Sequence, residues 1–308
     1  LSSDTIDTPA GVHQLNKPNI MLIILESHSG ALCGYIDSTY SGVTPVLDSL
    51  ASLGAAFTRC YSSGHRSAHG ISSILTGYPT LPGLPLISQV DAVQSIPTLG
   101  SIMNKAGYTS TFYYGGDSNY DNMAGFARIN GFSRIIDQKD ISPGAEGTSW
   151  GKFDHHLFSA IVSQLEDAVS PFLSVVFTTT NHQPWKVPSE YEKKIPQFRD
   201  PKYNREKTLR TMNYVDHILG NFLNRSKDKP WFDNTIFIIT ADHGLRNNRQ
   251  DNDDLVNASI PLVVFCPAAV SQPVLSSTVC SQSDLLPLIL WFSGMESNSF
   301  NLKGKNPL

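Results

Sequence analysis

The stretch Asn19-Ile-Met-Leu-Ile-Ile-Leu-Glu26 is the most apolar run of the chain and ends in a carboxylate. A second apolar run, Thr235-Ile-Phe-Ile-Ile-Thr-Ala-Asp-His243, ends in a carboxylate followed by an imidazole. Continuous runs of this composition are typical of strands that are buried on both faces of a parallel sheet. Ligands of open α/β sheets bind at the carboxyl ends of the strands. The two runs therefore predict an α/β fold that brings these polar side chains to one edge of its sheet.

The residues at these strand ends suit a metal ion. Glu26, Asp242 and His243 offer oxygen and nitrogen ligands of the kind that Mn²⁺, Mg²⁺ or Zn²⁺ accepts. The loop between residues 62 and 70 is rich in hydroxyl and basic groups and contains Ser67. A bound divalent cation would depress the pKa of a serine hydroxyl and orient it as a nucleophile. Each residue alone is more often structural, and their joint placement at strand ends favours a metal site.

A third buried run adds a candidate acid. Residues 171–180 read as a strand, and Asn181 and His182 follow it directly. An imidazole at this edge could protonate a leaving oxygen or hold a substrate oxygen. Residues 67–70 precede an expected helix, whose N-terminus favours an anion. The pattern predicts chemistry on a phosphoryl or sulfuryl group.

Bulk composition limits the class of protein. The 308 residues are 40% hydrophobic, which is enough for one large α/β domain. The formal net charge of −4, without a long basic run, argues against a nucleic-acid partner. No apolar stretch reaches the length of a membrane span. None of the four cysteines forms a C-x-x-C pair, and the sequence leaves open whether they are free or cross-linked: Cys33, Cys60, Cys266 and Cys280.

Alternating strand and helix patterns predict a central, mostly parallel sheet with helices on both faces and a small C-terminal subdomain. We expect a linker at 1–18 after an N-terminal anchor that the sequence lacks, a core at 19–259, and a C-terminal part of the same domain at 260–308. Further strands are expected at 57–61, 108–114 and 260–265. Helices are expected at 44–54, 71–77, 95–107, 153–169, 209–223 and 282–294, the last kinked by Pro287, and 115–151 reads as loop-rich.

Several short motifs occur in order along the chain. They are Asn19–Glu26, Gly42-Val-Thr-Pro45, Gly64-His-Arg-Ser-Ala-His-Gly70, Leu81-Pro-Gly83, Tyr114-Gly-Gly-Asp-Ser118, Trp150-Gly-Lys152, Thr180-Asn-His-Gln-Pro184, Pro230-Trp-Phe-Asp-Asn234 and Ala241-Asp-His-Gly244. In these motifs the chain resembles the extracellular catalytic domain of the lipoteichoic acid synthase family, the phosphoglycerol transferases of the sulfatase/alkaline-phosphatase superfamily. The resemblance runs from about Asn19 to the C-terminus.

The resemblance implies a metal centre with an attached nucleophile. Glu26, Asp242 and His243, together with the Ser67 hydroxyl, would bind one divalent ion. Manganese is the favoured ion, with Mg²⁺ or Zn²⁺ as alternatives. Ser67 would be the nucleophile at a position where the family usually has Thr. His65 and His69 would line the loop without binding the metal.

The resemblance also implies a substrate site. Trp150 and Lys152 match an aromatic-x-basic head-group motif in which the family often has Arg, so a point charge replaces a bidentate fork. His182 matches a histidine that contacts the substrate. Arg66 and Arg246 lie beside these motifs and could contact phosphate.

The activity implied by the resemblance is transfer of a phosphoglycerol-type head group from a phosphatidylglycerol-like phospholipid to a glycan or polyol acceptor, through a covalent phospho-Ser67 intermediate. The domain would be anchored to the cell membrane and face the extracytoplasmic side, either the periplasm or the cell surface. Three alternatives stay open: a phosphoethanolamine transferase, a sulfatase or phosphodiesterase that hydrolyses a soluble ester, and a degenerate domain that binds anionic lipid or glycan without catalysis. The sulfatase branch proper fits less well, because Glu26-Ser27 replaces its paired aspartates and Ser67-Ala-His-Gly70 lacks its Pro and Arg.

Overall fold

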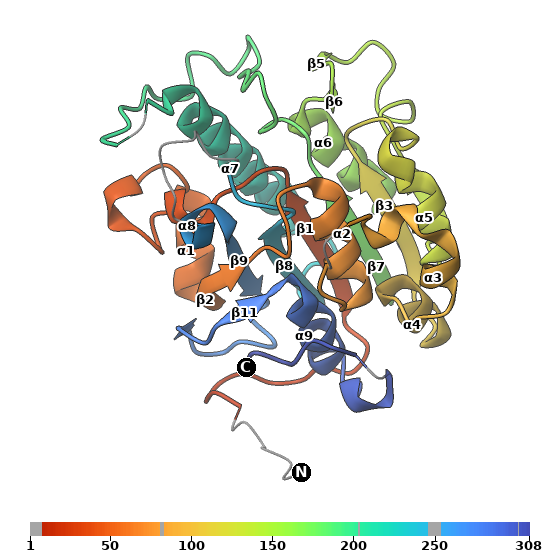
Figure 1. Ribbon diagram of the computed structural model, residues 1–308. Coiled ribbons are helices and arrows are strands. Elements are labelled where there is room, and N and C mark those ends of the chain that lie inside the picture. Colours follow the sequence, from red (N-terminus) through yellow and green to blue (C-terminus); the bar gives the residue numbers. More distant parts are fainter. Residues whose placement is uncertain (1–7, 81–82, 203, 246–253, 301) are drawn as a thin grey trace.

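A computed structural model describes residues 8–80, 83–202, 204–245, 254–300 and 302–308. Within these residues one nine-stranded sheet forms the centre of the molecule (Figure 1). Its strand order is β10-β2-β9-β8-β1-β7-β3-β4, and β11 also pairs with β2. The strands are β1 (Asn19–Leu25), β2 (Ala55–Tyr61), β3 (Thr109–Tyr114), β4 (Arg134–Ile136), β7 (Phe172–Phe177), β8 (Thr235–Ala241), β9 (Ser259–Phe265), β10 (Val274–Ser276) and β11 (Cys280–Ser281).

The two apolar runs form neighbouring central strands. β1 pairs in parallel with β8 on one side and with β7 on the other. Leu25 lies opposite Ala241, and Ile24 lies opposite both Thr240 and Phe177. The residues that follow β1, β7 and β8 therefore emerge side by side at the carboxyl edge of the sheet. The fold class predicted from the sequence is confirmed, with β9 running antiparallel to both of its neighbours.

Helices cover both faces of the sheet (Figure 1). Alternate residues of β1 face two separate apolar clusters: Ile20, Leu22 and Ile24 belong to one, and Met21, Ile23 and Leu25 to the other. The first cluster includes side chains of α2 (Ser67–Thr76), α4 (Leu99–Lys105), α5 (Met123–Ile129) and α9 (Leu285–Phe292). The second includes those of α1 (Pro45–Leu53), α6 (Asp154–Gln164) and α7 (Glu206–Ser226). Burial of both strand faces explains why these strands read as unbroken apolar runs.

Three local expectations need correction. α2 begins at Ser67, four residues before the expected start. The segment 115–151 contains α5, β4 and the short strands β5 (Gly147–Thr148) and β6 (Gly151–Lys152), although it reads as loop-rich. The helix expected at 282–294 is shorter, because residues 282–284 form a 3-10 turn and α9 begins at Leu285; Pro287 lies in the first turn of α9, where an N–H group would have no partner within the helix. Two further short helices are α3 (Val90–Gln94) and α8 (Asp254–Ala258).

The C-terminal part of the chain is joined to the same sheet. β9 inserts between β2 and β8, and β10 and β11 both pair with β2. The proposed divisions at residues 18 and 260 stay predictions. In the described part of the chain, no helix is both long and apolar enough to cross a bilayer.

Candidate metal centre and active site

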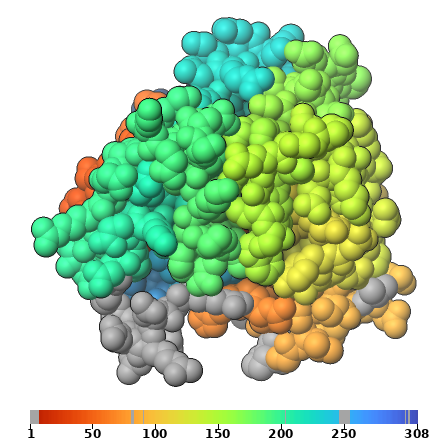
Figure 2. Space-filling view, turned by 90° about the horizontal axis from the view of Figure 1, so that it is seen from above, coloured from red at the N-terminus to blue at the C-terminus, as the bar shows by residue number. Residues whose placement is uncertain are grey.

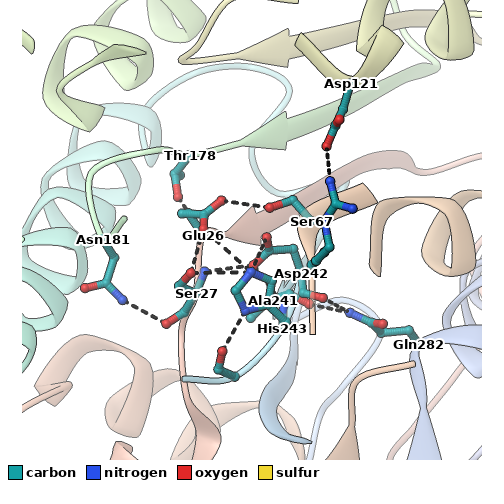
Figure 3. A network of polar contacts seen from close by, with 12 residues as sticks. Glu26, Ser27, Ser67, Asp121, Thr178, Asn181, Ala241, Asp242, His243 and Gln282 are labelled. Atoms are coloured by element: carbon teal, nitrogen blue, oxygen red, sulfur yellow. Dashed lines mark hydrogen bonds and ion pairs between the residues drawn. The ribbon is translucent and has the colours of Figure 1, made fainter. Parts of the chain in front are cut away.

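The three predicted metal ligands come together at the carboxyl edge of the sheet (Figure 3). Glu26 follows β1, and Asp242 and His243 follow β8. Their ligand atoms lie within 4.8 Å of one another. All three side chains are buried, with Asp242 fully inaccessible. Adjacent parallel strands in register thus produce the cluster that the sequence predicts.

The hydrogen bonds of this cluster show which ligand atoms are available to a metal ion. His243 Nδ1 lies 2.6 Å from the Gly244 carbonyl oxygen, which can only accept, so we assign the imidazole proton to Nδ1. Nε2 is then a lone-pair donor, 3.4 Å from Asp242 Oδ2 and 3.8 Å from Glu26 Oε1. Asp242 Oδ2 is buried and accepts no hydrogen bond from the described residues. Two carboxylates and an imidazole lone pair fit a divalent cation.

The pKa of Glu26 also indicates a site for a cation. Burial, followed by the charge of Asp242, raises the pKa of Glu26 well above its ordinary value of 4.5. Hydrogen bonds from Ser27 and Ser67 oppose this rise. Two buried carboxylates repel each other unless a proton or a cation lies between them. A bound cation would therefore relieve the repulsion between the carboxylates of Glu26 and Asp242.

Ser67 lies at the first position of α2, beside the cluster. Its Oγ donates to Glu26 Oε2 at 3.4 Å. The preceding residue, Arg66, is the N-cap in an extended conformation, and its side chain makes no capping hydrogen bond. The N-terminus of this ten-residue helix therefore lies beside the hydroxyl, where it favours an anion. The hydroxyl predicted as nucleophile thus lies between a carboxylate and a helix N-terminus.

Ser27 is a central residue of this site that the sequence pattern does not reveal. Its backbone is left-handed, with φ of 48°. Its N–H donates to Asp242 Oδ1 at 2.8 Å, and its Oγ donates to Glu26 Oε1 at 2.6 Å. Its carbonyl accepts from Asn181 Nδ2 at 3.0 Å. One strained residue therefore fixes both carboxylates, and its position directly after Glu26 is the only signal that could have found it.

The loop after β7 is held by buried hydrogen bonds. Thr178 Oγ1 accepts from the N–H of Glu26 at 2.9 Å. Asp154, at the start of α6, accepts from the N–H groups of Thr179 and Thr180 at 3.0 and 3.2 Å. Burial raises the pKa of Asp154 to about 6 against these donors. These bonds place His182 at the end of a fixed loop.

A cavity of about 470 Å³ opens next to Ser67. Its wall includes Trp150 and His182, whose ring centroids lie 3.8 Å apart, and Tyr120, which meets the Trp150 ring edge-on at 5.7 Å. Arg66 also lines the cavity and pairs with Asp121 at 3.4 Å. The site belongs to the face seen from above in Figure 2, where the yellow-green segments around residues 115–150 adjoin the green segments around 180–200.

Not every predicted residue joins this group. Lys152 does not line the cavity, and its Nζ donates to the carbonyl of Ala145 at 2.7 Å. His65 is exposed and His69 lies in the first turn of α2, and neither belongs to the metal cluster of the described residues. Arg246 lies outside the described residues. The structure thus assembles the predicted metal cluster, Ser67, Trp150, His182 and Arg66, and it leaves Lys152 turned elsewhere.

A buried carboxylate–imidazole cluster at the strand ends, with a hydroxyl at a helix N-terminus, defines an enzyme-like α/β protein of the alkaline-phosphatase type. The sulfatase family profile matches residues 18–295, and the chain belongs to the sulfatase family. A protein of the alkaline phosphatase superfamily from Vibrio parahaemolyticus aligns with a TM-score of 0.80 at 27% identity, over 94% of this chain and 71% of that one. The lipoteichoic acid synthase LtaP from Listeria monocytogenes aligns with a TM-score of 0.84 at 17% identity, over 97% and 77%.

Sequence relatives point to one branch of this superfamily. Lipoteichoic acid synthase 1 from Bacillus subtilis (strain 168) is 25% identical over 305 residues, which cover 92% of this chain and 46% of that protein. The lipoteichoic acid synthase of Staphylococcus aureus (strain USA300) is 25% identical over 309 residues, which cover 94% and 47%. The chain therefore spans about half the length of these curated relatives. The resemblance to lipoteichoic acid synthases drawn from the motifs is confirmed.

Proposed function

We propose that this chain is the catalytic domain of a metal-dependent phosphotransferase that moves a phosphoglycerol-type head group through a phosphoserine at Ser67. The observation that carries the proposal is the placement of the Ser67 hydroxyl. It donates to Glu26, lies at the N-terminus of α2 and borders an open cavity. A serine in that position can attack a bound phosphodiester. Other residues of the chain would bind the metal, transfer protons and bind the head group.

Glu26, Asp242, His243 and Ser67 would hold one divalent cation, with Mn²⁺ favoured over Mg²⁺ or Zn²⁺. When bound, this ion would lower the pKa of the Ser67 hydroxyl and offset the negative charge of the phosphoryl group. The His243 tautomer and the Ser27 hydrogen bonds prepare the ligands, because they fix which lone pairs face inward.

The chain's own residues suit a double displacement. Ser67 Oγ forms a bond to phosphorus and the bond to the diacylglycerol oxygen breaks, while the hydroxyl proton is directed at Glu26 Oε2. The leaving oxygen takes a proton, which His182 on the cavity wall would supply. An acceptor hydroxyl then attacks the phosphoserine and gives its proton to His182, while the released Ser67 oxygen takes back the proton held by Glu26. Both displacements exchange one P–O bond for another, so no other reactant is needed.

The cavity wall offers a site for a small polar head group. The rings of Trp150 and His182, which are in contact and tilted by 36°, would form an apolar face with polar edges. Arg66, which lines the cavity, would offer a cation to the phosphate. A head-group role for Lys152 requires its Nζ to leave the Ala145 carbonyl. A Lys152→Gln variant that raises KM would support this role, and an unchanged KM would remove it.

A phospholipid donor such as phosphatidylglycerol would bring the reaction to a membrane surface. The resemblance to the lipoteichoic acid synthase family implies that the domain works at the extracytoplasmic face of the cell membrane, held by an N-terminal anchor. The acceptor would be a glycan or polyol. The names of the relatives describe synthases of lipoteichoic acid and so support the activity from which this setting is inferred.

The test is turnover of head-group-labelled lipids by metal-stripped protein, with Mn²⁺, Mg²⁺ or Zn²⁺ added back. Phosphatidylglycerol, phosphatidylethanolamine, a soluble phosphodiester and a soluble sulfate ester distinguish the transferase from its alternatives. We expect metal-dependent release of diacylglycerol from phosphatidylglycerol. Ser67→Ala should abolish it, and Ser52→Ala, an exposed serine on α1, should not. Head-group binding without turnover of any of these would replace the proposal with a binding domain.

A further inference from the structure

We propose that Gln282 is a positioning residue. It holds the end of β8, which carries Asp242 and His243, against the loop of residues 62–66 that leads to Ser67. This inference rests on the proposed function, because it concerns the same site. Gln282 lies between β11 and α9, more than 200 residues along the chain from Ser67. Neither the sequence motifs nor the strand-end pattern points to it.

The side-chain amide of Gln282 joins two segments of the site, and Figure 3 shows its contacts with Ala241 and Asp242. Its Nε2 donates to the backbone carbonyls of Ala241 and Asp242 at 2.9 and 2.6 Å. Its Oε1 accepts from the backbone N–H of Ser63 at 2.8 Å. The side chain is fully buried, with 0% exposure. Both amide hydrogens and the amide oxygen are therefore used, one end on the strand that carries the metal ligands and the other on the loop that leads to Ser67.

The same two segments approach each other at backbone distance. A Cβ atom at Gly70, in the first turns of α2, would lie 1.9 Å from the Asp242 carbonyl oxygen and 2.8 Å from Gln282 Nε2. Only glycine fits there, so α2 packs directly on the backbone of Asp242. Gln282 completes this contact from the loop side. Asp242 is then held at its side chain by Ser27 and at its carbonyl by Gln282.

The chemistry of the contact requires an amide. Two carbonyl oxygens need donors and one N–H needs an acceptor, and a carboxamide offers both within one side chain. A buried carbonyl or N–H group that loses its partner destabilises the fold, because it has no water to bond instead. Partners that orient metal ligands typically change metal affinity by roughly 10- to 100-fold when they are removed. Loss of Gln282 should therefore be felt at the metal site, although Gln282 touches no ligand atom.

The experiment compares two buried amides in the full chain. Gln282→Met keeps an unbranched side chain of similar length and removes all three hydrogen bonds. Asn19→Leu is the matched control, because Asn19 also has 0% exposure and joins three segments, with bonds to Trp231, Thr235 and Phe172. Asn19 lies at the opposite end of β1 from Glu26. Both variants should lower the midpoint of thermal unfolding, but only Gln282→Met should change the properties of the metal site.

Three measurements are made on each variant: the Kd for Mn²⁺ alone, hydrogen exchange of the Ser63 amide, and kcat and KM for the labelled lipid. We expect Gln282→Met to weaken Mn²⁺ binding by roughly 10- to 100-fold, to speed Ser63 exchange and to lower kcat more than it raises KM. Asn19→Leu should leave all three near wild type. Gln282→Glu keeps the acceptor for Ser63 and removes the donors, so it should weaken Mn²⁺ binding while Ser63 stays protected.

Equal effects of Gln282→Met and Asn19→Leu on Mn²⁺ affinity and Ser63 exchange would overturn the inference, as would no effect of Gln282→Met. The proposed function fails separately. If no lipid is turned over, while Gln282→Met alone weakens Mn²⁺ binding and exposes Ser63, Gln282 is the positioning residue of a metal site with another substrate. If the wild-type chain binds no metal, the proposed function fails and Ser63 exchange alone decides on Gln282.

Discussion

Replacing Glu26 by Gln should stabilise the metal-free protein and destabilise the metal-loaded one. Ligand oxygens of Glu26 and Asp242 lie within 4.8 Å of each other in a buried cluster. Two unit charges at that distance repel by about 3 kcal/mol at an effective dielectric constant of 20. Ser27 and Ser67 donate to different oxygens of Glu26, and Gln has one oxygen, so it keeps an acceptor for only one of them. The lost acceptor and the lost charge assistance offset about 1 kcal/mol of the gain. The net gain of the variant in metal-free buffer is therefore about 2 kcal/mol.

The assay is thermal unfolding of wild type and Glu26→Gln at pH 8, with EDTA or with Mn²⁺. For a chain of 308 residues, the unfolding entropy converts about 2 kcal/mol into a rise of about 3 °C in the EDTA sample. Mn²⁺ at a thousand times its Kd adds about 4 kcal/mol, or about 6 °C, to the wild type. The variant lacks one charged ligand and should gain far less, so the order of stability should reverse.

The pH dependence of this difference has a defined sign. The raised pKa of Glu26 means that the folded metal-free protein binds this proton more tightly than the unfolded chain does. Stability of the wild type in EDTA is therefore lost as the pH rises above 4.5, and the advantage of Glu26→Gln shrinks as the pH falls back towards 4.5. Glu166→Gln, on the exposed partner of Lys229, is the control and should stay within about 0.5 kcal/mol of wild type. A variant that is less stable than wild type in EDTA, or that gains the full Mn²⁺ shift, would refute the reasoning.

Three further predictions follow from single groups. Burial raises the pKa of Asp216 to about 7, although two N–H groups of α1 donate to it. In urea unfolding, the free energy of unfolding of the wild type should therefore fall by up to about 4 kcal/mol between pH 4 and pH 8, and that of Asp216→Asn should not. All four cysteines are buried, so a thiol-specific disulfide reagent should label none in the native protein and four after denaturation; native labelling would contradict the packing. Arg66→Ala should raise KM for an anionic lipid by roughly 3- to 10-fold with little change in kcat; a change in kcat alone would place Arg66 outside head-group binding.

The sequence predicts the centre of this molecule because strand ends obey a simple rule. Unbroken apolar runs mark strands buried on both faces, and parallel neighbours deliver their next residues to one edge. Glu26, Asp242 and His243 therefore come together as predicted. The direction of a strand, by contrast, leaves no trace in periodicity, so the sequence does not reveal that β9 runs antiparallel.

Some residues of the site could not be predicted from the sequence, for physical reasons. Ser27 acts through a left-handed backbone and short-range hydrogen bonds, which no hydrophobic pattern encodes. Gln282 acts across a sequence distance that only the folded sheet closes. α5 had a readable signal, since its buried Met123, Phe126 and Ala127 follow helical spacing within a segment dominated by turn residues. Lys152 matched a motif by type and position, but its side chain bonds to Ala145 in this structure.

The most direct test of the account is mass spectrometry of the Ser67 peptide after brief mixing of the Mn²⁺-loaded protein with phosphatidylglycerol, followed by acid quench. The proposed phosphoserine mechanism predicts a phosphoglyceryl group on Ser67, absent without Mn²⁺ and absent when Glu26→Gln replaces the wild type. Diacylglycerol release with Ser67 unmodified, or undiminished release by Ser67→Ala, would contradict the claim that this hydroxyl is the nucleophile.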